Sequence, residues 1–252
     1  MTDSEVLPIY IGWDSREQDA YEVCRFSIID RTKASTYIRP LKHRTLRAEG
    51  LFDRPWRVGE TGQYVDERDG KPFSTEFSHS RWLTYLLAKR DVPSAKWAAF
   101  MDCDFLFQAN IKELFALADE RFAVMCVKHR HTPTDSVKMD GVAQTSYHRK
   151  NWSSLVLFNL QHPLNADLTV DVVNHKPGSW LHSFSWLKDE DIGELPPEWN
   201  WIQGVSPDVT PKAVHYSEKA PWFIEHGGLW ELERSRMRNP RPSIWDRLKE
   251  SA

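Results

Sequence analysis

Short apolar runs alternate with segments of helical periodicity through the first half of the chain. The apolar runs, which have the length of buried strands, cover residues 8–12, 36–41, 97–101 and 122–127. The helical segments, which repeat apolar residues at intervals of three and four, cover residues 14–30, 78–90 and 110–118. Strands that alternate with helices in this way predict an α/β fold built on a largely parallel sheet.

The pattern also indicates which face of the first helix points inward and which residue caps the third. The inward-facing positions of the first helix are Ala20, Val23, Cys24, Ser27 and Ile28. Asn110 stands at the start of the third helical segment, where its side chain would cap the helix.

The second half of the chain is less regular. Residues 155–160 and 213–216 read as strands, and residues 165–174 read as a helix. Residues 50–72 mix Gly, Pro, Asp and Arg without periodicity, so this segment is predicted to be a long loop.

Length and composition fit one domain of ordinary size. The 252 residues show no repeat and no linker, so we expect a single domain over residues 1–252, with a core of about 8–223 and a tail of 224–252. No apolar stretch approaches the roughly 18 residues of a membrane-spanning helix. The acidic, polar first residues do not resemble a secretory signal, which favours a cytoplasmic location.

Charge and cysteine content give no support to general nucleic-acid binding or to a framework of disulfides or zinc. With 33 Lys and Arg against 36 Asp and Glu, the net charge of -3 gives no general attraction to nucleic acid. The 3 cysteines show no CxxC spacing and cannot form a fully paired disulfide framework. Any anionic ligand must therefore be bound by a local group of residues.

Asp102 and Asp104 form the sharpest local feature. They directly follow the apolar run at residues 97–101. In an extended backbone, residues two apart point the same way, so both carboxylates can address one cation. Paired charges among apolar residues are costly unless a cation offsets them. A second Asp-x-Asp pattern, at residues 189–191, lies in a charged segment and reads as solvated surface. The first pair therefore predicts a divalent metal site.

Three kinds of enzyme use two aspartates after a strand. A haloacid-dehalogenase-type phosphatase carries Thr or Val four residues beyond its nucleophile, where this chain has Leu106. A nucleotidyltransferase has a glycine-rich phosphate loop after the first strand, where this chain has only Gly12. A glycosyltransferase with a sugar-nucleotide donor needs neither, because its metal ion bridges the diphosphate. The pattern favours a glycosyltransferase.

Six short segments, taken in order, support this interpretation. They are Ile9-Tyr10-Ile11-Gly12-Trp13-Asp14, Phe77-Ser78-His79-Ser80-Arg81-Trp82, Phe100-Met101-Asp102-Cys103-Asp104, Leu155-Val156-Leu157-Phe158-Asn159-Leu160, Leu195-Pro196-Pro197-Glu198-Trp199-Asn200 and His215-Tyr216-Ser217-Glu218-Lys219-Ala220-Pro221-Trp222. Through them the chain resembles the family 8-type glycosyltransferases, a retaining group that includes bacterial lipopolysaccharide galactosyltransferases and glycogenin. The resemblance implies an α/β fold of GT-A type, with a Rossmann-like mixed sheet flanked by helices and a C-terminal helical tail.

The resemblance also implies the reaction and its metal. The donor would be a nucleoside diphosphate sugar, with UDP the expected nucleotide, and a hexose-type sugar would pass to a hydroxyl acceptor with retention. Asp102 and Asp104 would be the catalytic metal ligands and His215 the third ligand. The expected ion is Mn²⁺, or Mg²⁺, since imidazole beside carboxylates suits manganese better than calcium.

The resemblance also implies that three further residues contact the nucleoside diphosphate sugar. Asp14 would face the base or ribose, Arg81 would approach the base or phosphates, and Lys219 would contact the diphosphate. The residues alone also allow plainer roles: a loop-capping Asp14, a surface-paired Arg81 and a structural His215.

One residue and one three-residue segment depart from the family pattern. Trp152 stands where the family has an asparagine, and Phe184-Ser185-Trp186 stands where it often has Asp-Gln-Asp. In the family these positions contact the transferred sugar. Trp152 would therefore shape the donor-sugar or acceptor pocket, where an indole stacks on the apolar side of a pyranose; the alternative is a core residue.

Two other functions remain open at this point. One is a non-catalytic nucleotide- or carbohydrate-binding protein on the same fold, and the other is a metal-dependent phosphohydrolase. The acceptor is also open among a glycan, a lipid-linked sugar, a protein and a modified nucleic acid.

The C-terminal tail mixes aromatic and basic residues. These are Trp230, Arg234, Arg236, Arg238, Arg241 and Trp245. The tail is expected either to pack on the domain as a helix or to make a weak peripheral contact with the inner face of a membrane.

Overall fold

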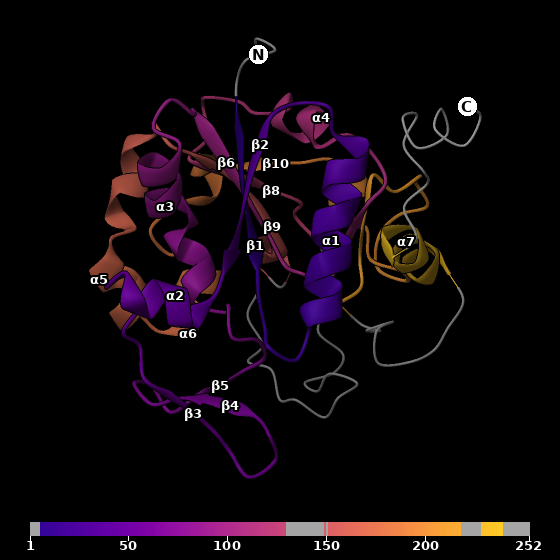
Figure 1. Cartoon of the computed structure of the whole chain (residues 1–252). Helices are drawn as coiled ribbons and strands as arrows, with labels where there is room; N and C mark the ends of the chain where they lie inside the picture. The colour runs from indigo at the N-terminus through magenta and orange to yellow at the C-terminus, as the bar shows by residue number, and fades with distance from the viewer. Residues whose placement is uncertain (1–5, 130–148, 150, 218–227, 239–252) are drawn as a thin grey trace, which may run out of the picture.

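The computed structural model describes residues 6–129, 149, 151–217 and 228–238, and a six-stranded mixed sheet lies at its centre (Figure 1). The strand order is β10-β8-β9-β6-β1-β2. The strands that run in one direction are β1 (Leu7–Gly12), β2 (Thr36–Leu41), β6 (Trp97–Met101), β8 (Val124–Cys126) and β10 (Ile192–Glu194). β9 (Leu155–Asn159) runs antiparallel to them, between β6 and β8. The expected α/β fold with a mixed sheet is confirmed.

Helices cover both faces of the sheet (Figure 1). One face carries α1 (Gln18–Arg31), α4 (Ile111–Phe115) and, outside α1, α7 (Leu229–Arg238). The other face carries α2 (His43–Ala48), α3 (Thr84–Asp91), α5 (Val170–His175) and α6 (Gly178–His182). The predicted helices at 78–90 and 165–174 each begin as a short 3-10 helix, η1 (Ser80–Leu83) and η3 (Pro163–Asp167), before α3 and α5.

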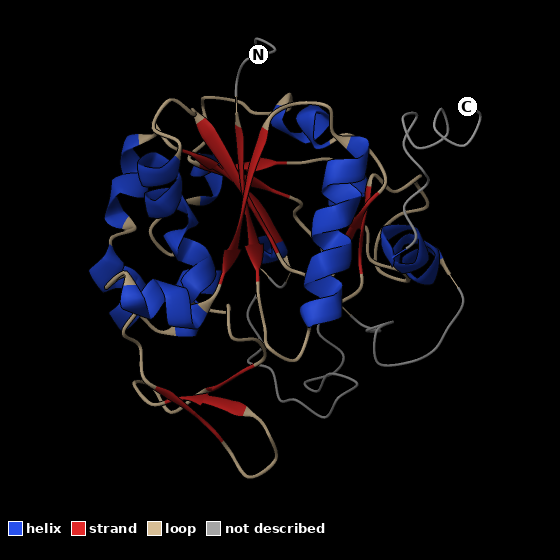
Figure 2. Ribbon diagram, in the orientation of Figure 1, coloured by secondary structure: helices blue, strands red, loops and turns tan. Residues whose placement is uncertain are grey.

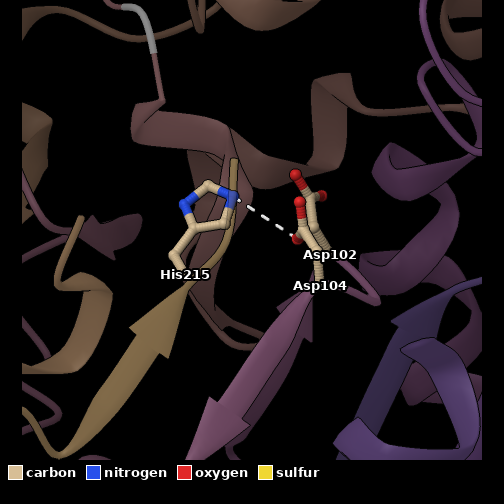
Figure 3. Close-up of side chains that lie close together, drawn as sticks. All are labelled: Asp102, Asp104 and His215. Carbon is tan, nitrogen blue, oxygen red and sulfur yellow. Dashed lines mark ion pairs between the residues drawn. The ribbon is translucent and has the colours of Figure 1, made fainter. Parts of the chain in front are cut away.

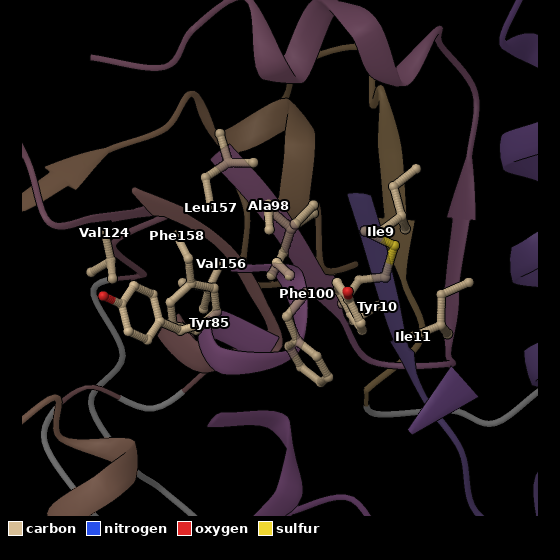
Figure 4. Close-up of a cluster of buried hydrophobic side chains, with 14 of the residues drawn as sticks. Ile9, Tyr10, Ile11, Tyr85, Ala98, Phe100, Val124, Val156, Leu157 and Phe158 are labelled. Carbon is tan, nitrogen blue, oxygen red and sulfur yellow. The ribbon is translucent and has the colours of Figure 1, made fainter. Parts of the chain in front are cut away.

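The core forms around β1, β6 and β9, which are buried along their whole length. Their near-continuous apolar sequences suit strands that are covered on both faces. Figure 4 shows side chains from these strands, among them Ile9, Phe100 and Phe158, packed into one cluster. Gly12 ends β1 where a Cβ atom would clash with the ring of Phe77, so the position has room only for glycine.

The inward face predicted for α1 is confirmed, because Ala20, Val23, Cys24, Ser27 and Ile28 are all buried. The helix starts at Gln18, four residues later than predicted. A turn comes first, in which the Asp14 carboxylate accepts a hydrogen bond from the Arg16 backbone nitrogen at 2.9 Å. The predicted cap of α4 is also present, since the Asn110 side chain accepts a hydrogen bond from the Lys112 backbone nitrogen at 2.9 Å.

The segment predicted as a long loop contains a small antiparallel sheet, which corrects that prediction. Its strands are β3 (Trp56–Val58), β4 (Tyr64–Asp66) and β5 (Pro72–Phe73). Ring centroids lie 4.9 Å apart for Trp56 and Tyr64 and 5.4 Å apart for Tyr64 and Phe73. Strands of two or three residues are too short to show an alternating pattern. The small sheet projects from the body of the molecule (Figure 2).

A second small sheet and the C-terminal helix pack together beside α1. β7 (Phe105–Phe107) pairs antiparallel with β11 (Ala213–His215). Trp230 of α7 is buried against Leu106, Val214 and Val23, which belong to β7, β11 and α1. The described part of the tail therefore packs on the domain. Arg241 and Trp245 lie outside the described residues, and membrane contact stays a prediction.

Ion pairs join α7 to α1. Arg31 donates two hydrogen bonds to the buried carboxylate of Glu233, at 2.6 and 2.9 Å. Arg236 adds a hydrogen bond to Asp30 at 2.7 Å. No described helix is both long and apolar enough to cross a membrane.

Trp230→Ala should lower the free energy of unfolding by about 3–5 kcal/mol, because it empties the space between α7 and the two strands behind it. Leu232→Ala is the matched control, since Leu232 lies on the same helix and is 60% exposed. Urea unfolding of both variants provides the measurement. Equal losses in the two variants would mean that the Trp230 contacts contribute nothing of their own.

Candidate functional site

Asp102, Asp104 and His215 meet at the end of the central sheet. Asp102 follows β6, Asp104 precedes β7, and His215 is the last residue of β11 (Figure 3). One ligand atom from each of the three lies within 4.8 Å of the others. The Nε2 atom of His215 is 3.4 Å from the Asp104 Oδ1 atom. The structure thus brings together the three residues proposed as metal ligands.

The orientation of His215 suits a metal ligand. Its ring is buried and stacks on Phe105, with centroids 4.5 Å apart and an angle of 11° between the planes. Its Nδ1 atom lies 2.8 Å from the Asn200 Oδ1 atom, an acceptor, so we assign the proton to Nδ1. Nε2 then carries the lone pair and faces the carboxylates. Two carboxylates and one imidazole form a donor set that could hold a divalent metal ion.

Asn200 holds the ring of His215 from the side away from the carboxylates, a role that its sequence position did not indicate. It is fully buried at the end of the 3-10 helix η5 (Pro197–Asn200), and its Nδ2 atom donates to the Asn151 carbonyl at 3.2 Å. Such hydrogen bonds fix the tautomer and the direction of a metal-binding histidine. The only sequence signal was its place in the segment Leu195-Pro196-Pro197-Glu198-Trp199-Asn200.

Arg81 is paired, but inside the protein and not at its surface. Its Nη1 atom lies 2.8 Å from the Asp102 Oδ1 atom and donates to the Ser153 carbonyl at 2.9 Å. The guanidinium also lies 5.3 and 5.1 Å from the ring centroids of Phe77 and Phe100. The structure therefore gives Arg81 a direct contact with a candidate metal ligand. Its contact with the base or phosphates stays a prediction.

Asp14 holds the loop that follows β1. Its fully buried carboxylate accepts hydrogen bonds from the Arg16 side chain at 2.9 and 3.0 Å and from the Glu76 backbone nitrogen at 3.0 Å. These contacts are those of the loop-capping role. The predicted contact with the base or ribose is not tested by them, and Lys219 lies outside the described residues.

Trp152 lies next to the site, at the entry to β9. It is half-buried, and its indole nitrogen donates to the His129 carbonyl at 3.1 Å. The cationic groups of Lys128 and Arg149 each lie 5.5 Å from its ring. Two residues further on, the Ser154 carbonyl accepts a hydrogen bond from the Asp102 backbone nitrogen at 2.9 Å. Its role in a sugar pocket stays a prediction.

Two of the residues that replace the Asp-Gln-Asp pattern belong to an aromatic cluster. The Trp186 ring centroid lies 5.3 Å from that of Trp82 and 5.6 Å from that of Phe184. Phe184 is fully buried although its φ of 52° falls in the left-handed region. Packing explains Phe184 and Trp186 without a sugar contact.

The whole chain was compared with protein families, with characterised proteins and with solved structures. No family model matches the chain. Protein CDI of Arabidopsis thaliana is 44% identical over 253 residues, which cover 95% of this chain and 91% of that protein. The chain belongs to the family of Protein CDI.

Solved glycosyltransferases share the architecture of this chain. The bifunctional glycosyltransferase WbbM superposes with a TM-score of 0.58 at 15% identity, over 100% of this chain and 52% of WbbM. GlyE of Streptococcus pneumoniae TIGR4 gives 0.53 at 13%, over 92% and 60%. An active-site mutant of LgtC gives 0.55 at 12%, over 95% and 99%. The chain thus spans only about half of WbbM and three fifths of GlyE. The GT-A-type fold is confirmed.

Asn200→Ala should weaken Mn²⁺ binding by about 10–100-fold, because His215 loses the partner that orients it. Asn200→Asp keeps an acceptor at the same place and should retain most of the affinity. Titration of free Mn²⁺ by electron paramagnetic resonance measures both variants. An Asn200→Ala protein with unchanged affinity would show that His215 needs no such support or binds no metal.

Proposed function

We propose that this protein is a metal-dependent glycosyltransferase that transfers a sugar from a nucleoside diphosphate donor to a hydroxyl acceptor. One observation carries the proposal: Asp102, Asp104 and His215 converge at the carboxyl end of β6. In α/β sheets, ligands bind at the carboxyl ends of the strands. The fold shared with WbbM, GlyE and LgtC supports the same reaction class.

Some residues of the site would bind the metal ion, and others hold those ligands in place. Asp102, Asp104 and the Nε2 atom of His215 would hold the divalent ion, which we propose to be Mn²⁺ or Mg²⁺. The ion would supply positive charge that stabilises the diphosphate as it leaves the sugar. Arg81 fixes Asp102 from behind, and Asn200 fixes His215. One carboxylate and the imidazole are thus positioned before any ligand arrives.

The finer details of the reaction rest on the family 8-type resemblance. UDP is the proposed nucleotide and retention the proposed outcome, with an oxygen of the leaving diphosphate taking the proton of the acceptor hydroxyl. LgtC, described as a galactosyltransferase in complex with donor and acceptor sugar analogues, superposes with a TM-score of 0.50. This supports a sugar donor for the present chain, while the acceptor stays open among glycan, lipid-linked sugar, protein and modified nucleic acid. We also propose a cytoplasmic location.

Asp104→Ala should abolish Mn²⁺-dependent binding of UDP, because it removes one of the two carboxylates that offset the charge of the ion. Asp171→Ala is the matched control, since the Asp171 side chain is 82% exposed on α5 and lies outside the proposed metal site. Isothermal titration calorimetry with UDP, with and without Mn²⁺, measures the effect. If folded Asp104→Ala protein binds UDP as the wild type does, the metal assignment is wrong.

A donor screen separates the proposed function from its alternatives. Purified protein is incubated with Mn²⁺ and UDP-, GDP- or CMP-sugars, with and without candidate acceptors, and the released nucleotide is measured. Release of UDP that depends on Mn²⁺ and is lost in Asp104→Ala is the expected result. Tight binding without any release would favour a non-catalytic binding protein. Phosphate release from simple monoesters would favour a phosphohydrolase.

A further inference from the structure

Arg81 places a permanent positive charge against a candidate metal ligand. Its Nη1 atom is 2.8 Å from the Asp102 Oδ1 atom, and only 5% of the residue is exposed. The guanidinium group is the positive charge nearest to Asp102 among its ion pairs in the described structure. Burial away from water also reduces the screening of the charge. An ion that enters beside Asp102 therefore meets this positive charge.

Several contacts keep Arg81 in this place. Its Nη1 atom donates to the Ser153 carbonyl at 2.9 Å, and its guanidinium lies close to the rings of Phe77 and Phe100. Ser153 is itself buried, and its hydroxyl lies 2.8 Å from the Nδ1 atom of His182 on α6. Arg81 is thus built into the wall of the site and is not a mobile surface side chain.

The charges of the site explain what this does to a bound ion. The carboxylates of Asp102 and Asp104 carry two negative charges, and Arg81 cancels one of them. A divalent ion then meets a cluster with a net charge of about -1, which binds it more weakly than two unopposed carboxylates would. A diphosphate supplies the missing negative charge, and it is attracted by both the ion and Arg81.

We propose that Arg81 keeps the Asp102–Asp104–His215 site weak for a free divalent ion and makes tight metal binding depend on the anionic diphosphate of the donor. The ion and the nucleotide then bind as a unit. Because such coupling is reciprocal, the ion raises the affinity for the diphosphate by the same factor. This inference rests on the proposed function and assigns Arg81 a role beyond contact with the donor.

The test is titration of Mn²⁺ by electron paramagnetic resonance, with and without saturating UDP. For the wild type we expect Mn²⁺ affinity to rise at least about tenfold when UDP is present. Arg81→Met removes the charge and keeps the apolar stem, so it should bind free Mn²⁺ about tenfold more tightly and gain less from UDP. Arg81→Lys keeps the charge and should bind free Mn²⁺ as weakly as the wild type.

Arg81→Gln is a second neutral variant, which retains a donor for the Ser153 carbonyl if Arg81→Met does not fold. Thermal unfolding checks that each titrated variant is folded. A folded neutral variant that binds free Mn²⁺ no more tightly than the wild type would overturn the inference, because Arg81 would then act only by positioning Asp102.

The wild type distinguishes this inference from the proposed function. If it binds Mn²⁺ as tightly without UDP as with it, the inference is wrong but the metal site stands. If it binds no Mn²⁺ under either condition, the metal-dependent function is wrong, and the inference fails with it.

Discussion

Asp102 and Asp104 bring two negative charges to the end of β6, a strand that is buried over its whole length. Carboxylates in such surroundings are tolerated only where neighbouring positive charge or a cation offsets them. Arg81 meets this need on one side of the pair, through Asp102. On the other side Asp104 faces the Nε2 lone pair of His215, which brings no charge and so leaves a cation to complete the site. The geometry of the site therefore depends on the elements that position Arg81 and His215.

The fold holds the two partners by different means. Arg81 stands in η1 ahead of α3, on the face of the sheet opposite α1, and it reaches Asp102 past the rings of Phe77 and Phe100. His215 depends on the pairing of β11 with β7, which sets it opposite Phe105. Trp230 of α7 packs behind the same two strands. The C-terminal helix therefore supports the strands that carry the histidine, although it lies well beyond them along the chain.

The sequence and the structure agree where the signal is local. All six strands predicted from apolar runs are present within two residues of their expected bounds. The Asp102–Asp104 pair could also be identified as a candidate metal site from the sequence, because two charged residues directly follow an apolar strand-like run. The meeting of His215 with this pair came from the family resemblance alone, since residues so far apart in the chain give no local signal of contact.

Contacts made only in the folded chain were not predicted. The Arg81–Asp102 ion pair and the Asn200–His215 hydrogen bond join residues from separate elements. The resemblance gave Asp14 a donor contact, which stays a prediction, and the structure shows that the Asp14 carboxylate accepts hydrogen bonds from Arg16 and from the Glu76 backbone. The aromatic side chains of Trp56, Tyr64 and Phe73 likewise pack together on a small sheet, in a segment whose sequence showed no periodicity.

The central claim is that Asp102, Asp104 and His215 bind the ion that carries the donor diphosphate. Crystals grown with Mn²⁺ and UDP test it most directly, with diffraction data collected above and below the manganese absorption edge. The account predicts one anomalous peak in contact with both carboxylates, the Nε2 atom of His215 and the UDP phosphates. Bound UDP with no manganese at these three side chains, or with manganese held elsewhere, would contradict it.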